Sequence, residues 1–139
     1  ISFFNLLSES LKAGDIILLE GDLGVGKTFI CQNIINNLTK NNLITSPTFN
    51  IVHTYKFLNG IEIWHCDFYR IIEAVEIDEL GVFDNLNKKI VLIEWPKFID
   101  NFSFHSLRIK IEFGKKNDER NLSFIFDKGW KNRLEILTI

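Results

Sequence analysis

Gly21-Asp22-Leu23-Gly24-Val25-Gly26-Lys27-Thr28 matches the pattern G-x-x-x-x-G-K-[ST], which is typical of a phosphate-binding loop, or P-loop. Its glycines permit backbone conformations in which successive N–H groups point at one phosphate. The ammonium group of Lys27 adds a positive charge beside the β- and γ-phosphates, and the hydroxyl of Thr28 can reach Mg²⁺. The pattern therefore predicts a nucleoside triphosphate site, formed by Asp22, Leu23, Gly24, Val25, Gly26, Lys27, Thr28 and the neighbouring Phe29.

The sequence on either side of this loop has the periodicity that a P-loop requires. Residues 15–20 are mostly apolar and lie between two glycines, which indicates a buried strand. Residues 28–38 place apolar side chains on one helical face, and the N-terminal end of such a helix attracts the same anion. A glycine-rich turn with a solvated lysine is the weaker interpretation of this strand–loop–helix context.

The rest of the chain alternates between helical and strand patterns. The predicted helices cover residues 2–13, 28–38, 73–80 and 130–137. The predicted strands cover residues 15–20, 51–57, 61–68, 90–93, 107–113 and 122–126, and the last two form an antiparallel hairpin with one buried face. We therefore expect a single domain over residues 1–139, with an α/β, P-loop NTPase-like layered fold in which helices flank a mixed parallel and antiparallel central sheet.

Composition excludes several classes of protein. The 139 residues carry 16 Lys and Arg against 18 Asp and Glu, a net charge of −2, so there is no basic excess for independent binding to nucleic acid. No apolar run approaches the roughly 20 residues of a membrane-spanning helix, and two cysteines cannot form a disulfide framework. We expect a cytoplasmic protein. Methionine is absent, so we also expect the natural N-terminus to have been processed or to lie outside this sequence.

A P-loop enzyme needs a carboxylate on an adjacent strand to hold Mg²⁺ or one of its waters. Glu94 follows the apolar run 90–93, at the end of a predicted strand where ligands of open α/β sheets bind. We therefore expect Thr28 and Glu94 to hold the metal. Most P-loop enzymes have Asp at this place, so Glu94 is a departure, although a chemically competent one. The next residue, Trp95, either packs in the core or lies beneath the site.

The segment His65-Cys66-Asp67-Phe68-Tyr69-Arg70 ends the second strand of the first predicted hairpin. Alternation places His65, Asp67 and Tyr69 on one face. Asp67 could orient or deprotonate an attacking water, and Arg70 could stabilise developing negative charge. Taken alone, the segment is better explained by a turn-closing ion pair between Asp67 and Arg70 and by a core histidine.

Thr48 lies after the P-loop helix, where switch-type nucleotide hydrolases sense Mg²⁺ and the γ-phosphate. An ordinary Ser-Pro turn explains the same segment equally well. The remaining histidines and both cysteines lack the spacing of a metal site, and we interpret them as structural: His53, His105, Cys31 and Cys66.

The order of these motifs resembles the TsaE (YjeE) family, small bacterial P-loop ATPases required for the threonylcarbamoyladenosine modification of tRNA. The resemblance covers residues 14–97. It is carried by Gly21–Thr28, Ser46-Pro47-Thr48-Phe49, His65–Arg70, Glu79-Leu80-Gly81 and Ile93-Glu94-Trp95-Pro96.

The resemblance implies that Lys27 and the P-loop amides bind the triphosphate of ATP. It likewise implies that Thr28 and Glu94 coordinate Mg²⁺, that Asp67 is the catalytic carboxylate and that Thr48 is switch-like. It further implies weak ATP hydrolysis by the protein alone and a function together with the TsaB and TsaD proteins. Contact with tRNA is then expected only through that complex, and no membrane partner is expected.

Three other functions remain open at this point. A small-molecule kinase normally needs an arginine-bearing lid, whereas the arginines of this chain are few and dispersed. A GTPase switch generally needs Asn-Lys-x-Asp after a strand, and Asn87-Lys88-Lys89-Ile90 lacks the acid and precedes its strand. A nucleotide-dependent interaction module, in which hydrolysis is incidental, differs from the ATPase only in whether turnover matters.

Overall fold

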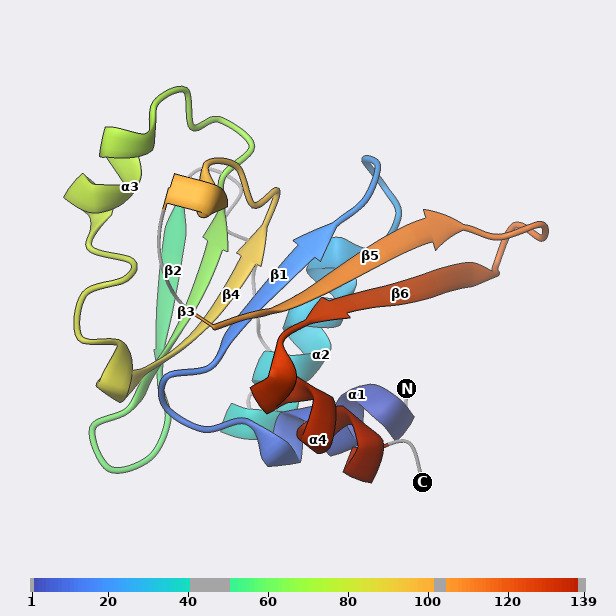
Figure 1. Ribbon diagram of the computed structural model, residues 1–139, viewed down its shortest axis with the longest axis horizontal. Helices are drawn as coiled ribbons and strands as arrows, with labels where there is room; N and C mark the ends of the chain where they lie inside the picture. Colours follow the sequence, from blue (N-terminus) through green and yellow to red (C-terminus); the bar gives the residue numbers. More distant parts are fainter. Residues whose placement is uncertain (1, 41–50, 102–104, 138–139) are drawn as a thin grey trace.

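The computed structural model describes residues 2–40, 51–101 and 105–137. Its centre is a six-stranded sheet with the order β2-β3-β4-β1-β5-β6, seen from one side in Figure 1. The strands are β1 (Ile16–Glu20), β2 (Val52–Lys56), β3 (Glu62–Asp67), β4 (Lys89–Glu94), β5 (Leu107–Phe113) and β6 (Arg120–Phe126).

The sheet is mixed, as the sequence predicts. Strands β3, β4, β1 and β5 are parallel to one another, and β2 and β6 pair antiparallel with β3 and β5 at the two edges. In register, Glu94 at the end of β4 lies beside Leu19 of β1 and beside Asp67 of β3. Because parallel strands end at the same edge of a sheet, the expected P-loop and both expected carboxylates meet there.

Helices cover both faces of the sheet. The larger core lies between one face and α1 (Ser2–Ser10), α2 (Lys27–Thr39) and α4 (Lys128–Leu137), and it includes Ile17 and Leu19 of β1. The other face packs against α3 (Ala74–Leu80) and the segments around the short helices η1 (Leu86–Lys88) and η2 (Ile99–Asn101), and it includes Ile16 and Leu18. Both faces of β1 are therefore buried, which explains its uninterrupted apolar sequence.

The C-terminal hairpin of β5 and β6 extends away from the body of the molecule (Figure 1). Leu107, Ile109 and Ile111 are buried against the helices, but Phe113 near the tip is 51% exposed. The prediction of one buried face is therefore correct for the inner part of β5 and wrong for β6, in which no residue is buried and Phe126, beside Leu107, is 43% exposed.

The predicted element boundaries shift by a few residues. The first helix ends at Ser10 rather than near residue 13, and β3 ends at Asp67, so Tyr69 lies beyond the strand and does not share its face. The predicted hairpin turn between β2 and β3 is present, with Asn59 and Gly60 at φ 52° and 80°. No helix within the described ranges is both long and apolar enough to cross a lipid bilayer.

Candidate functional site

The P-loop joins β1 to α2, as the sequence predicts. Gly26 precedes the first turn of α2 at φ 117°, and no side chain caps the helix there. The first N–H groups of α2 therefore remain available to an anion. At the other end of the loop, a Cβ on Gly21 would lie 2.5 Å from the carbonyl oxygen of Ile111. This close approach explains why the loop begins with glycine.

Lys27 is folded back onto its own loop. Its Nζ donates hydrogen bonds to the carbonyl oxygens of Gly21 at 2.5 Å and Asp22 at 2.9 Å, and it lies 4.1 Å from the centre of the Trp95 ring. Burial lowers the pKa of Lys27, and the carboxylates of Glu94, Asp67 and Asp22 oppose that shift. A phosphate would offer this ammonium group a charged acceptor in place of two neutral carbonyls.

Thr28 and Glu94 are brought into direct contact. The Thr28 hydroxyl donates to Oε1 of Glu94 at 2.6 Å, while Oε2 of Glu94 lies 2.6 Å from Nε2 of His65. Glu94 is 2% exposed, so its carboxylate is held by specific partners rather than by bulk water. A hydroxyl and a carboxylate are hard oxygen ligands of the kind that Mg²⁺ prefers, so this pair fits the expected metal.

Asp67 lies at the end of β3, beside Glu94 in the sheet register. Its Oδ1 accepts a hydrogen bond from the backbone N–H of Tyr69 at 2.9 Å. Burial raises the pKa of Asp67, the Tyr69 N–H opposes this shift, and the nearby Glu94 adds to it. The side chain is half-buried, so it combines a more basic carboxylate with access for a water molecule.

These residues surround a cavity of about 230 Å³. Its walls include Leu23, Gly24, Gly26, Lys27, Thr28, Phe29, Asp67, Glu94 and Trp95. It therefore joins an ammonium group, free helix N–H groups, a hydroxyl and two carboxylates in one space, a combination suited to a phosphate chain and a divalent cation.

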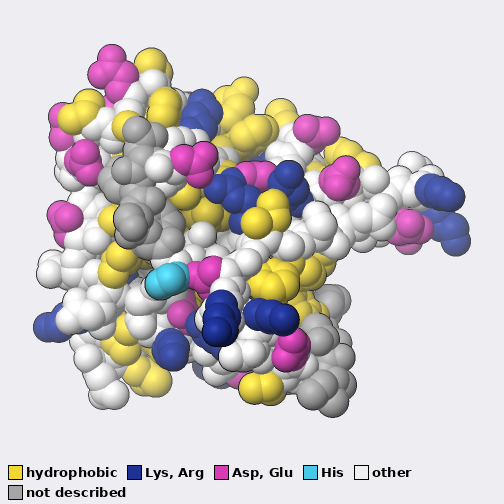
Figure 2. Space-filling model, in the orientation of Figure 1, with side chains coloured by type: hydrophobic (Ala, Val, Ile, Leu, Met, Phe, Trp, Pro, Cys, Tyr) yellow, Lys and Arg dark blue, Asp and Glu magenta, His cyan; other side chains and the backbone are white. Residues whose placement is uncertain are grey.

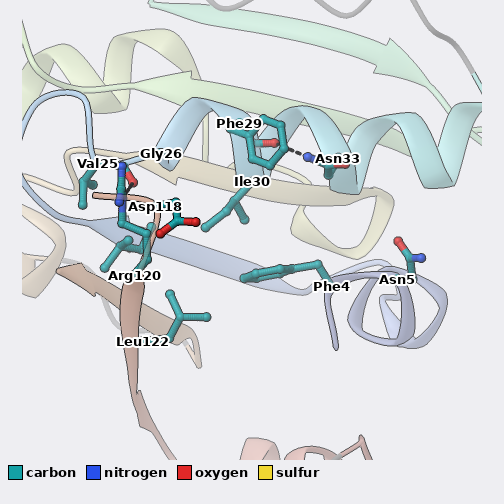
Figure 3. A pocket seen from close by; sticks show the side chains of 11 residues that line it. Phe4, Asn5, Val25, Gly26, Phe29, Ile30, Asn33, Asp118, Arg120 and Leu122 are labelled. Atoms are coloured by element: carbon teal, nitrogen blue, oxygen red, sulfur yellow. Dashed lines mark hydrogen bonds between the residues drawn. The ribbon is translucent and has the colours of Figure 1, made fainter. Parts of the chain in front are cut away.

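A second cavity of about 340 Å³ adjoins the P-loop on its other side. Figure 3 shows its walls: Val25, Gly26, Phe29, Ile30 and Asn33 from the loop and α2, Phe4 and Asn5 from α1, and Asp118, Arg120 and Leu122 from the hairpin. Most of these walls are apolar. Gly26 and Phe29 line both cavities, which makes the two spaces neighbours along the same loop.

Of the expected residues that the structure describes, Arg70 is not part of this assembly. Arg70 is exposed and makes no hydrogen bond or ion pair with any other residue that the structure describes, so the expected alternative of a pair with Asp67 is absent there. Thr48 lies outside the described residues.

Three further residues contact the site. The sequence pattern leaves a position beneath the site as one of two alternatives for Trp95, and it assigns His65 and Arg120 no role there. His65 contacts Glu94, Trp95 covers Lys27, and Nε of Arg120 donates to the carbonyl of Val25 at 3.0 Å. Strand alternation already places His65 on the face of Asp67, but the contacts of Trp95 and Arg120 depend on long-range packing. Trp95 also adopts φ 52°, a left-handed conformation that turns the chain directly after β4.

Comparison with known families and structures agrees with this geometry. Residues 2–122 match the family model described as "Threonylcarbamoyl adenosine biosynthesis protein TsaE". The fold is similar to the crystal structure of Bacillus subtilis YdiB, with a TM-score of 0.75 and 26% identity, covering 99% of this chain and 85% of that one.

Relatives from several bacteria carry the name tRNA threonylcarbamoyladenosine biosynthesis protein TsaE. The Rickettsia felis protein is 50% identical over 95 residues, 68% of this chain and 55% of that protein. The Rickettsia typhi protein is 48% identical over 99 residues, 70% of this chain and 68% of that protein. The Streptomyces coelicolor protein is 30% identical over 109 residues, 76% and 74% of the two chains. The matched region thus spans little more than half of the Rickettsia felis relative.

Proposed function

Because the chain belongs to the TsaE family of threonylcarbamoyl adenosine biosynthesis proteins, we propose that it binds Mg²⁺ and ATP and hydrolyses ATP in support of tRNA threonylcarbamoyladenosine modification. The observation that carries this proposal is the 2.6 Å contact between the P-loop hydroxyl of Thr28 and the carboxylate of Glu94. A glycine-rich turn with no ligand does not require a buried carboxylate from another strand beside its hydroxyl.

The proposed phosphate site uses groups that are already close together. The N–H groups at the start of α2 bind the phosphate chain, and Lys27 moves from the carbonyls of Gly21 and Asp22 to the β- and γ-phosphates. Thr28 and Glu94 hold Mg²⁺, which neutralises part of the phosphate charge when it is bound. Lys27 is then both a binding and a catalytic group, since it remains beside the phosphate as negative charge develops.

Asp67 is the proposed catalytic carboxylate. Its pKa is raised by burial, which strengthens it as a base, and its side chain lines the same cavity as Lys27 and Glu94. In this position it orients an attacking water and accepts its proton. Arg70 has no partner among the described residues and is exposed, so we assign it no role inside the cavity.

The second cavity is the proposed site for the nucleobase. Phe29, Ile30 and Phe4 give it apolar walls for a planar ring (Figure 3). Nδ2 of Asn33 donates to the carbonyl of Phe29 at 2.8 Å, which leaves Oδ1 to accept a hydrogen bond. The 6-amino group of adenine can supply that bond, whereas the 6-oxo group of a guanine in the same orientation would oppose it, so we propose a preference for ATP over GTP.

The proposed partners are the TsaB and TsaD proteins, with tRNA reached only through them, in the cytoplasm. The net charge is −2, and Figure 2 shows positive and negative side chains interspersed on the face in view, not a basic surface for RNA. Large apolar side chains lie exposed close to the cavity, Leu23 at 78% and Phe29 at 62%, which suits contact with a protein.

The contacts of the arginines do not favour the alternative of a small-molecule kinase. Arg108 pairs with Glu20, Arg133 pairs with Asp15, and Arg120 is bound to backbone carbonyls of the P-loop and the hairpin turn. Only Arg70 remains exposed and unpaired among the described residues. A lid that closes over a transferred phosphate needs arginines that are free to reach it, and the described part of the chain offers only Arg70.

The deciding experiment is an ATP hydrolysis assay with and without the TsaB and TsaD proteins and tRNA. We expect slow release of phosphate by the protein alone and faster release with the partners. Lys27→Ala should lose nucleotide binding and serves as the background. Phosphate transfer to a metabolite would instead identify a kinase. Binding of ATP without any Lys27-dependent hydrolysis would indicate a nucleotide-dependent interaction module.

A further inference from the structure

The carboxylate of Glu94 is held from two sides, and only one side belongs to the P-loop. Thr28 donates to Oε1, and Nε2 of His65 lies 2.6 Å from Oε2. The side chains of His65 and Glu94 are 0% and 3% exposed. The proposed function gives roles to Thr28 and Glu94 and leaves the buried histidine without one.

The geometry of the ring indicates which group donates. An ionised carboxylate only accepts hydrogen bonds, so Nε2 of His65 carries the proton that Glu94 accepts. Nδ1 of the same ring is buried and has no hydrogen-bond partner within the described residues. A neutral ring protonated on Nε2 leaves only a lone pair unsatisfied, whereas a proton on Nδ1 would leave a buried donor without an acceptor.

The length of the Glu94 side chain explains why such a contact is useful. Glutamate has one more methylene group and one more rotatable bond than the aspartate that is usual at this place, so its carboxylate can occupy more orientations. We propose that His65 is a positioning residue: its Nε2–H holds Oε2 of Glu94 and so aims the carboxylate at the Mg²⁺ position beside Thr28. This role rests on the proposed Mg²⁺–ATP site.

The surroundings of the pair strengthen the hydrogen bond. Cys31 from α2 packs beside it, and one ligand atom from each of Cys31, His65 and Glu94 lies within 4.8 Å of the others. Burial raises the pKa of the Cys31 thiol, so the thiol stays protonated at neutral pH and is a poor metal ligand. Cys31, His65 and Glu94 are all buried, and a hydrogen bond in such a place is stronger than in water.

Two amide variants of His65 separate positioning from packing. Gln places its amide nitrogen close to the position of Nε2, whereas the shorter Asn places it near Nδ1, away from Glu94. We would measure the affinity for a non-hydrolysable ATP analogue in EDTA and over a series of Mg²⁺ concentrations. The affinity in EDTA tests whether the fold and the P-loop are intact. The Mg²⁺ concentration that gives half of the increase in affinity tests how well Glu94 binds the metal.

In the wild type, Mg²⁺ should increase the affinity for the analogue. If Mg²⁺ has no such effect, both the proposed Mg²⁺ site and the role of His65 are wrong. Given that effect, His65→Gln should stay close to wild type. His65→Asn should need about 10- to 100-fold more Mg²⁺ at unchanged affinity in EDTA. Equal Mg²⁺ requirements of the two variants would overturn the positioning role while leaving the proposed function intact.

A measurement on the wild type keeps the inference testable even where a variant does not fold. The chain has only 3 histidines, so ¹⁵N NMR spectra of their rings can be assigned readily. We expect His65 as the neutral form with the proton on Nε2. A bare Nε2 would contradict the proposal, and so would a stoichiometric zinc ion bound through Cys31 and His65.

Discussion

Thr28 and Glu94 are separated by 66 positions in the sequence, yet the hydroxyl of one lies 2.6 Å from the carboxylate of the other. The contact exists because β4 lies beside β1 in a parallel pair, so that the end of β4 reaches the loop that follows β1. Every functional proposal for this protein depends on that edge of the sheet.

Replacing Glu94 tests the metal role of this contact directly. Glu94→Gln keeps the shape of the side chain but loses the negative charge that binds a cation, so we expect Mg²⁺-dependent ATP hydrolysis to fall by about 100-fold or more. Phosphate release measured over a Mg²⁺ series checks this. Glu112→Gln, on an exposed side chain of β5, makes the same charge change and should behave as wild type.

Asp67→Asn should separate binding from hydrolysis. The amide cannot accept a proton from water, so we expect hydrolysis to fall by about 10²- to 10⁴-fold, while affinity for ATP stays within a few-fold of wild type. Asp78→Asn on α3 is the matched control, because its side chain is exposed and belongs to neither cavity. Wild-type turnover by Asp67→Asn with the partners present would refute the assignment of the base.

The raised pKa of Asp67 also predicts how stability changes with pH. A carboxyl group whose pKa is higher in the folded state than in the unfolded state favours folding while it is protonated, and this contribution is lost as pH rises through the folded-state pKa. Asp67→Asn should therefore unfold at a higher temperature than wild type at neutral pH. The difference should shrink as pH falls below the ordinary range for Asp, which thermal unfolding at several pH values can measure.

Asn33 is the expected determinant of base preference. If its Oδ1 accepts from the amino group of adenine, Asn33→Ala should weaken ATP binding by about 5- to 10-fold, the effect of one hydrogen bond, and should reduce the preference over GTP. Competition between the two nucleotides for a fluorescent analogue measures both. Asn132→Ala, exposed on α4 and outside both cavities, is the control, and an unchanged ratio in Asn33→Ala would place the base elsewhere.

Arg133 should contribute to stability and not to nucleotide binding. Its guanidinium group donates to both carboxylate oxygens of Asp15, at 2.8 and 2.7 Å, and to the carbonyl of Ser10. Arg133→Met should leave Asp15, which is only 6% exposed, without its ion pair, and should lower the free energy of unfolding by about 2–4 kcal/mol. Urea unfolding tests this against Lys131→Met, an exposed neighbour on α4 that should change little.

Much of the site could be predicted because its chemistry is encoded locally. The P-loop pattern, the apolar strands β1 and β4, and acids directly after strands are short-range features, and each needs only a few neighbouring residues to be recognised. They were sufficient to predict a mixed α/β sheet with Lys27, Thr28 and Glu94 near one edge, whereas the role expected for Asp67 depended on the family resemblance.

The partners of these residues required the folded chain. His65 and Cys31 look like ordinary core residues in the sequence, and only the pairing of β3 with β4 beneath α2 brings them to Glu94. Arg120 reaches the P-loop from β6 for the same kind of reason. Local sequence encodes which groups are present and how the backbone turns around them. Which groups meet depends on strand order and helix packing, because these bring together side chains that are far apart along the chain.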